Sequence, residues 1–270
     1  MKADLHVHTN VSDSNYSIEE TIQQAKKNGV QYLGIVDHDT TVGLEKALKI
    51  GEKYQVKVIP GIEISAYDFK RKRKIHILGY NFDLKAVNIQ KLCDPIIQRR
   101  YENCIWQIER LIENDYNISL EEVEAKANKS TCLYKQHIMA VLMEKGYTDS
   151  IYSDLYRELF KDKGICARDI EYVDAFKAVE AIKKDKGLAI LAHPGQTNSY
   201  EIIEELQEVG LDGLELYHED NSPEDYKRIM EYALKYNFLL SGGSDFHGDY
   251  GGKTDIGELP VPFKYVREFL

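Results

Sequence analysis

Short apolar segments that suit β-strands alternate with helical segments at both ends of this 270-residue chain. The first 63 residues follow the order β-α-β-α-β, which favours parallel strands with helices outside the sheet. The same alternation returns after residue 174. Strand patterns lie at residues 4–8, 32–37, 56–63, 74–80, 187–192, 211–217 and 238–241, and helical patterns at 17–28, 41–54, 174–184, 199–208 and 222–236. The chain is therefore predicted to be an α/β protein with a parallel, barrel-like sheet.

Helical patterns dominate between residues 85 and 160, where no clear strand pattern is found. We interpret this stretch as a helical subdomain, residues 97–165, that is inserted into the barrel. The barrel itself would then comprise residues 1–96 and 166–270. A chain of 270 residues is long enough for one large domain that carries such an insertion.

The strand pattern nearest the N-terminus carries two histidines with one residue between them. Side chains of a strand alternate between its faces, so Asp4, His6 and His8 share one face, opposite the apolar side chains between them. Two imidazoles so placed can reach the same metal ion. Asp13 lies in the polar loop that follows and can fold back over the end of the strand. Alone, the same pattern also fits a strand that is half exposed to water.

Further polar side chains follow other strand patterns at their carboxyl ends. In an α/β barrel these ends meet at one rim, which is where catalytic groups lie. Taken singly, each residue can also be a turn, helix-capping or surface residue. Their repeated position at the same end of successive strands indicates a common site instead. The residues are Asp37, His38, Glu63, His193, Asp245 and His247.

This mixture of side chains is typical of a metal cluster. Imidazoles combined with carboxylates suit zinc, manganese or iron, whereas an all-oxygen set favours magnesium or calcium. The candidates outnumber the ligands of one tetrahedral ion, so we expect a cluster in which one carboxylate bridges two ions. Such a pair of ions lowers the pKa of a bridging water and stabilises an oxyanion, which suits hydrolysis of a phosphate ester.

Five segments closely resemble the motifs of the PHP (polymerase and histidinol phosphatase) family, in that family's order. They are Asp4-Leu5-His6-Val7-His8-Thr9 with Ser12-Asp13, Gly34-Ile35-Val36-Asp37-His38-Asp39, Pro60-Gly61-Ile62-Glu63-Ile64, Ala192-His193-Pro194-Gly195 and Gly243-Ser244-Asp245-Phe246-His247-Gly248. The resemblance spans nearly the whole chain. It implies a metal-dependent phosphoesterase built on a distorted (β/α)7 barrel, with three divalent metal ions (Mn, Fe or Zn) at the rim.

The resemblance also implies metal ligands, carried over residue by residue. One ion would be held by His6, His8, Glu63 and Asp245, a second by the bridging Glu63 with His76 and His193, and a third by Asp13, His38 and His247. The assignment of His76 as a ligand rests on its position alone, because its strand carries no family motif. Asp4 and Asp37 are interpreted as carboxylates that orient imidazoles, with strand-end or turn carboxylates as the alternative.

The insertion resembles that of the small stand-alone phosphoesterase branch, which implies that it recognises the substrate. Nucleotide-cleaving members have an Arg-Pro-His segment that faces the phosphate, whereas this chain has Tyr134-Lys135-Gln136-His137 at the comparable place. The difference speaks against a nucleoside 3′,5′-bisphosphate and favours phosphoribosyl 1,2-cyclic phosphate, whose ring is opened and whose freed phosphate is then removed. Lys135 and His137 are candidates for phosphate contacts or solvated groups at a helix N-terminus, and His218 is a weaker candidate.

The implied mechanism is an in-line attack on phosphorus by a hydroxide that bridges two metal ions. Asp245, His247 or His137 would protonate the leaving oxygen, and the sequence does not choose among them. The rival interpretations are a nucleoside 3′,5′-bisphosphate or oligonucleotide 3′-to-5′ phosphatase-exonuclease, a C–N hydrolase, and a metal-binding module without catalysis. The complete ligand set argues against the last of these.

The net charge of the protein indicates which kinds of binding partner are disfavoured. There are 35 Lys and Arg residues against 45 Asp and Glu residues, a net charge of −10. This disfavours adhesion to nucleic acid polymers or anionic membranes. It does not disfavour a small phosphorylated substrate, because metal ions supply positive charge. The basic run from Lys70 to Lys74 is interpreted as a solvated turn.

The cysteines and the N-terminal sequence give information on the cellular compartment of the protein. Cys93, Cys104, Cys132 and Cys166 form no CxxC pair and suggest no disulfide framework. No signal peptide and no apolar run of transmembrane length is recognisable. We therefore expect a cytoplasmic protein, and the sequence leaves its oligomeric state open.

Overall fold

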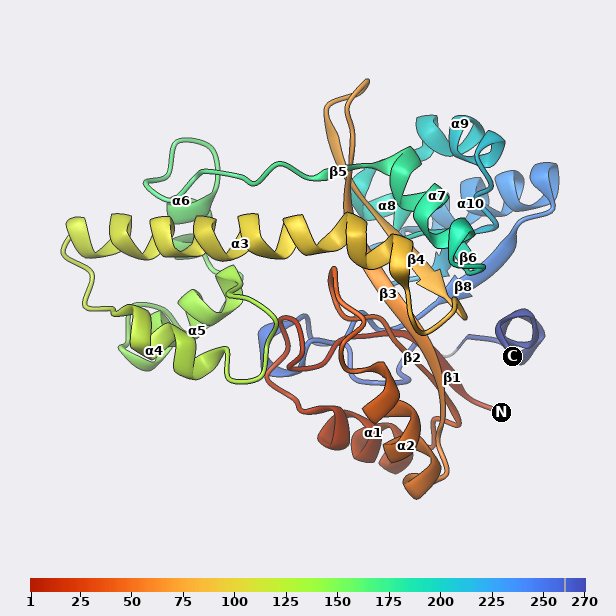
Figure 1. Cartoon of the computed structure of the whole chain (residues 1–270), viewed down its shortest axis with the longest axis horizontal. Helices are drawn as coiled ribbons and strands as arrows, with labels where there is room; N and C mark the ends of the chain where they lie inside the picture. The colour runs from red at the N-terminus through yellow and green to blue at the C-terminus, as the bar shows by residue number, and fades with distance from the viewer. Residues whose placement is uncertain (260) are drawn as a thin grey trace.

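A curled sheet of eight strands forms the body of the computed structural model, which describes residues 1–259 and 261–270. Its strand order is β1-β2-β3-β4-β6-β7-β8, with β5 beside β3. The strands are β1 (Ala3–Val7), β2 (Tyr32–Ile35), β3 (Lys57–Asp68), β4 (Arg73–Tyr80), β5 (Val173–Asp174), β6 (Leu188–Leu191), β7 (Gly213–Tyr217) and β8 (Leu239–Gly242). The curled sheet with helices outside it agrees with the predicted distorted α/β barrel (Figure 1).

Strand β4 departs from the predicted parallel order. It runs antiparallel to both of its neighbours, β3 and β6, whereas the pairs β1–β2, β2–β3, β6–β7 and β7–β8 are parallel. The prediction of uniformly parallel strands is therefore wrong at β4. The segment between Asp68 and Arg73 is too short for the helical crossover that parallel strands require, so it closes a hairpin instead.

Helices cover the outside of the sheet, and several begin at a capping residue visible in the sequence. Ser17 caps α1 (Ile18–Lys27) in a capping box with Glu20, and Ser222 caps α10 (Pro223–Tyr236) in the same way with Asp225. Figure 1 shows α1 and α2 on one side of the sheet and α7, α9 and α10 on the other. The remaining helices of this part are α2 (Leu44–Tyr54), α7 (Ala175–Lys184), α8 (Pro194–Thr197), α9 (Ile203–Glu208) and α11 (Phe263–Val266).

Four helices make up the region between β4 and β5. They are α3 (Val87–Glu113), α4 (Leu120–Lys126), α5 (Lys135–Glu144) and α6 (Asp154–Phe160). Helix α3 runs out from the barrel, and the other three lie along its far half (Figure 1). Its first half packs into the barrel core through Ile89 and Ile96, whereas Ile108 and Leu111 belong to a separate apolar core. Residue 97, the predicted start of the insertion, therefore lies inside a continuous helix.

The two ends of the sheet approach each other next to the first strand. The backbone N–H of His8 donates to the carbonyl of Phe246 at 2.9 Å, and the N–H of Asp245 donates to that of His6 at 2.9 Å. These bonds bring the loop after β8 against β1, so the first and last polar motifs of the chain share one rim. No helix within residues 1–259 or 261–270 is long and apolar enough to span a bilayer.

Candidate metal centre and active site

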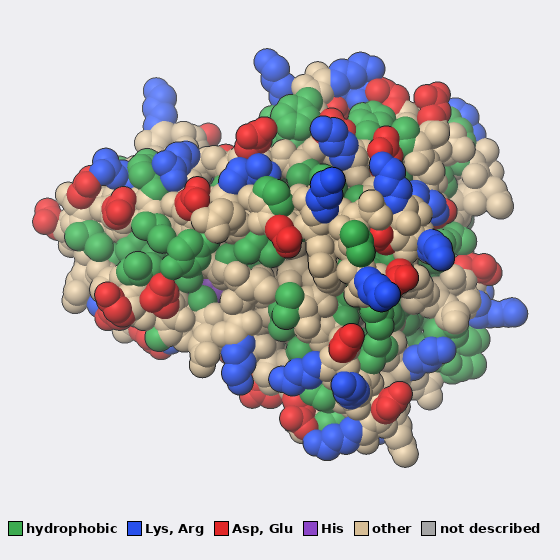
Figure 2. Space-filling model, viewed as in Figure 1, with side chains coloured by type: hydrophobic (Ala, Val, Ile, Leu, Met, Phe, Trp, Pro, Cys, Tyr) green, Lys and Arg blue, Asp and Glu red, His purple; other side chains and the backbone are tan. Residues whose placement is uncertain are grey.

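The polar side chains predicted at the strand ends gather in one buried cluster. His6 and His8 are fully buried, and Glu63 and His193 are each only 1% exposed. Histidine atoms are accordingly almost hidden in the surface view of Figure 2. The end of β2 is tied to β3 because the N–H of Asp39 donates to the carbonyl of Glu63 at 2.9 Å. This bond places the motif that contains His38 beside the motif that contains Glu63.

A first group of four ligand atoms surrounds one point. The Nε2 atoms of His6 and His8 lie 3.3 and 3.2 Å from Oε2 of Glu63. They lie 3.2 and 3.3 Å from Oδ1 of Asp245. Two imidazole nitrogens and two carboxylate oxygens, all within 4.8 Å of one another, can hold one metal ion. These are the four residues that the resemblance assigned to one ion.

The second oxygen of Glu63 faces different imidazoles. Its Oε1 lies 2.8 Å from Nδ1 of His76 and 3.0 Å from Nε2 of His193. His38 lies instead beside the first oxygen, with its Nδ1 3.3 Å from Oε2 of Glu63. Glu63 therefore has the position of a carboxylate that bridges two ions, and His76 lies where the weakest of the sequence predictions put it.

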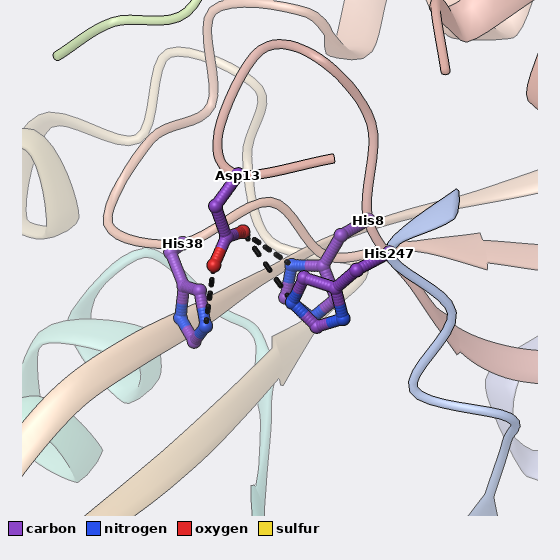
Figure 3. A group of neighbouring side chains, drawn as sticks. All are labelled: His8, Asp13, His38 and His247. Atoms are coloured by element: carbon purple, nitrogen blue, oxygen red, sulfur yellow. Dashed lines mark ion pairs between the residues drawn. The ribbon is translucent and has the colours of Figure 1, made fainter. Parts of the chain in front are cut away.

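A third group forms around Asp13. Figure 3 shows its carboxylate directed toward three imidazoles, with His38 on one side and His8 and His247 on the other. The carboxylate oxygens lie 3.9 Å from Nδ1 of His8, 3.9 Å from Nε2 of His38 and 3.4 Å from Nε2 of His247. The fold thus brings together Asp13, His38 and His247, as the resemblance implied, and adds His8 to them.

The hydrogen bonding of the cluster is incomplete in a way that fits metal ions. Buried polar atoms normally have partners, yet several here have none among the described residues. They include His6 Nε2, both ring nitrogens of His8, Asp13 Oδ1, His38 Nδ1 and Asp245 Oδ1. Each belongs to a residue of the three groups, and together they offer the nitrogen and oxygen ligands of divalent transition metals.

The electrostatics of Glu63 and His38 favour their ligand forms, whereas the neighbouring carboxylates outweigh burial at His6 and His8 and raise the pKa of both imidazoles. Burial alone would raise the pKa of the Glu63 carboxyl, but the surrounding imidazoles outweigh it and hold that pKa well below its ordinary value. Burial lowers the pKa of His38 to about 4, so this imidazole is neutral at pH 7. An ionised carboxylate and a neutral imidazole are the forms that bind metal.

Glu215 orients two of these ligands, and the sequence analysis missed it. Its Oε1 lies 2.9 Å from Nδ1 of His6, and its Oε2 accepts the backbone N–H of His193 at 2.8 Å. The first contact turns Nε2 of His6 toward the cluster. The second holds His193 at a φ of 23°, a strained backbone for a non-glycine residue. The sequence feature that could have indicated this role is a glutamate between two leucines in an apolar strand.

Asp4 and Asp37 do not contact imidazoles directly, so their predicted orienting role needs correction. Asp4 accepts backbone N–H groups of Ser244 and Gly257, at 3.0 and 2.7 Å. Asp37 accepts hydrogen bonds from Thr9 and Ser12. Both carboxylates therefore fix the loops that carry ligands, because backbone and hydroxyl donors are closer to them than any ring nitrogen.

Comparison with protein families matches residues 4–239 to the PHP domain. The chain belongs to the PHP family. It is 46% identical to a phosphoribosyl 1,2-cyclic phosphate 1,2-diphosphodiesterase from Eggerthella lenta, over 95% of this chain and 98% of the relative. A 5′-3′ exoribonuclease from Haemophilus influenzae is 28% identical, over 97% of each chain.

A crystal structure supports the same conclusion. A Bifidobacterium adolescentis protein proposed to be a metal-dependent phosphoesterase superposes with a TM-score of 0.91 at 28% identity, covering 99% of this chain and 94% of the other. The predicted enzyme class is confirmed. This PHP protein is a metal-dependent hydrolase of phosphoric ester bonds, and its clustered His, Asp and Glu side chains can bind the metal.

A cleft of about 190 Å³ opens from the PHP cluster toward the helical region. Asp13, His38 and His76 line it on the barrel side, and Lys135 of α5 lines it on the other. Arg100 of α3 also lines the cleft, and the sequence analysis missed this residue. Its position inside a helix without a motif gave no sign of such a role.

His137 and His218 occupy different places from Lys135. His137 is 1% exposed, and its Nδ1 accepts the backbone N–H of Tyr134 at 3.1 Å, so it caps α5. His218 is also 1% exposed, and its Nε2 lies 3.3 Å from Oδ2 of Asp245. Neither is among the residues that line the cleft. The geometry therefore supports a substrate contact for Lys135 more than for either histidine.

Proposed function

We propose that this PHP enzyme hydrolyses a phosphoribosyl 1,2-cyclic phosphate, first opening the cyclic diester and then removing the freed phosphate. The observation that carries the proposal is the near-full-length similarity to the Eggerthella lenta diphosphodiesterase. The cleft of about 190 Å³ beside the cluster suits a small phosphorylated metabolite. We also propose that the barrel, residues 1–96 and 166–270, binds the metal and that residues 97–165 recognise the substrate.

The three side-chain groups would hold three divalent ions, and we propose manganese, iron or zinc for them. Glu63 would bridge the ion of His6, His8 and Asp245 to that of His76 and His193. Asp13, His38 and His247 would hold the third. When bound, such ions polarise phosphoryl oxygens and lower the pKa of a coordinated water.

The remaining roles concern phosphate binding and proton transfer. Lys135 would donate to a substrate phosphate from the helical side of the cleft. Asp245 and His247 lie at the cluster and are better placed than the capping His137 to protonate the leaving oxygen. We assign His218 to holding Asp245, because its Nδ1 accepts the N–H of Asp220 at 3.1 Å and leaves Nε2 to donate.

A cytoplasmic location is part of the proposal. All four cysteines are free and buried, which suits a reducing compartment.

The test is metal analysis of the purified protein combined with phosphate release from a panel of substrates. The panel comprises phosphoribosyl 1,2-cyclic phosphate, a nucleoside 3′,5′-bisphosphate and several sugar phosphates. We expect the highest kcat/KM for the cyclic substrate and loss of activity after chelation. A higher kcat/KM for the bisphosphate would contradict the proposed substrate, and no phosphate release from any compound would favour a non-catalytic metal-binding module.

A second candidate is removal of nucleotides from the 5′ end of RNA, which the similarity to the Haemophilus influenzae exoribonuclease favours. A 5′-phosphorylated oligoribonucleotide in the same assay distinguishes the two. Shortening of this oligonucleotide at a higher kcat/KM than the opening of the cyclic substrate would establish the exonuclease instead.

A further inference from the structure

Three lysines from separate parts of the chain line the side of the cleft formed with the helical region. Lys74 lies on β4, Lys135 is the first residue of α5, and Lys161 directly follows α6. Asp169 lines the same end of the cleft. Three ammonium groups beside one carboxylate leave this end with an excess of positive charge, in a protein whose net charge is −10.

The single carboxylate is already engaged. Asp169 forms an ion pair with Lys74 and accepts a hydrogen bond from the hydroxyl of Tyr172 at 2.7 Å. Lys135 and Lys161 form no ion pair with any residue that the structure describes. Their Nζ atoms lie against aromatic rings instead, 5.8 Å from the ring centre of Phe160 and 5.6 Å from that of Tyr156.

Gathering these cations is unfavourable without an anion. Burial, with smaller contributions from the neighbouring Lys74 and Lys161, lowers the pKa of Lys135 to about 8, although Asp169 acts in the opposite direction. A bound dianion would reverse this, since each ammonium could donate a charge-assisted hydrogen bond to a phosphate oxygen. The arrangement has the composition of an anion site.

We infer that Lys74, Lys135 and Lys161 form a distal phosphate subsite, which binds a second phosphate group of the substrate while the first reacts at the metal cluster. This inference rests on the proposed function. A phosphoribosyl 1,2-cyclic phosphate carries one phosphate in the ring and another on the ribose. The subsite would select substrates with two phosphate groups over those with one, and it would orient the ring toward Asp13, His38 and His76.

The test compares phosphoribosyl 1,2-cyclic phosphate with ribose 1,2-cyclic phosphate, which lacks the distal group, on the metal-loaded full chain. For the wild type we expect kcat/KM to be at least a hundredfold higher for the first compound. In Lys161→Met and Lys74→Met this ratio should fall at least tenfold, mainly through KM. Lys163→Met and Lys72→Met remove neighbouring exposed lysines that do not line the cleft, and should keep the wild-type ratio.

Binding of ribose 5-phosphate to the same proteins, measured by calorimetry, gives a readout that does not depend on turnover. Its Kd should rise at least tenfold in Lys161→Met and Lys74→Met and stay unchanged in the two control variants. Equal Kd values in all five proteins would overturn the subsite, as would a wild-type kcat/KM ratio near one. If no protein opens either cyclic compound, the proposed function fails, and the binding data still decide whether the subsite exists.

Discussion

The guanidinium of Arg100 donates through Nη2 to Oδ2 of Asp39 at 2.6 Å, which joins helix α3 to the loop after β2. The same Nη2 lies 2.9 Å from Oγ of Ser65, and the guanidinium stacks 4.9 Å from the ring centre of Tyr134. The hydroxyl of Tyr134 in turn donates to the carbonyl of His38 at 3.1 Å. The helical region is thus attached to the loop after β2 both at the side chain of Asp39 and at the backbone of the candidate metal ligand His38.

Replacing Arg100 should therefore affect both stability and activity. Arg100→Met leaves the fully buried Asp39 without its cationic partner, so we expect a loss of about 3 kcal/mol in the free energy of unfolding. Chemical denaturation measures this loss, and phosphate release should fall with it. The double variant with Asp39→Asn should recover part of the stability, because the unpaired charge is gone.

The neighbouring Arg99 provides the control for this prediction. It has no ion pair within the described parts of the chain, and Arg99→Met should change stability by less than about 0.5 kcal/mol. If Arg100→Met and Arg99→Met unfold at the same denaturant concentration, the contact with Asp39 does not join the two parts of the protein.

Glu63 should be indispensable for metal binding and turnover. Both of its oxygens face imidazoles, so Glu63→Ala removes ligands of two proposed ions at once. We expect kcat/KM to fall by more than the 10–100-fold typical of residues that only support a ligand. Bound metal, measured by elemental analysis, should also decrease while circular dichroism shows an intact fold. Glu109→Gln changes an exposed glutamate and should alter neither quantity. A fully active, fully metallated Glu63→Ala protein would contradict the bridging role.

Glu215 should tune metal affinity without binding the metal itself. In Glu215→Gln one carboxylate oxygen becomes an amide nitrogen, so the side chain can no longer accept from both His6 Nδ1 and the N–H of His193. We expect the metal affinity to fall about 10–100-fold. Titration of the metal-free protein measures this change, and excess metal should restore most of the turnover. Unchanged affinity would mean that packing alone orients His6; Glu208→Gln, on an exposed position, is the control.

The ligand cluster could be predicted from the sequence because its members follow strand ends, where local pattern and barrel geometry determine position together. His6, Glu63 and His193 illustrate this, since each belongs to a short motif. Arg100 and Glu215 could not be predicted in the same way. Their partners lie 61 and 209 residues away, and only the packed structure brings them together.

The antiparallel strand β4 was missed for a related reason. Its apolar pattern is compatible with either parallel or antiparallel pairing. Only the short connection between Asp68 and Arg73 determines that the two strands form a hairpin. His76 lies at the cluster as expected, although the direction of its strand was predicted wrongly. The side-chain alternation of a strand is the same in both directions, which explains why the face was right and the topology wrong.

Lys135 should make substrate binding sensitive to pH. Burial lowers its pKa to about 8, below the ordinary value for lysine, so its positive charge is present at pH 7 and is lost as the pH rises through 8. The substrate phosphate is already mostly ionised at pH 7, so its charge changes little above that pH. We therefore expect KM for phosphoribosyl 1,2-cyclic phosphate to rise roughly tenfold between pH 7 and 9.5. Steady-state kinetics across this range measures the rise. Lys135→Arg stays charged throughout and should show a flat KM, whereas a flat KM in the wild type would exclude Lys135 from phosphate binding.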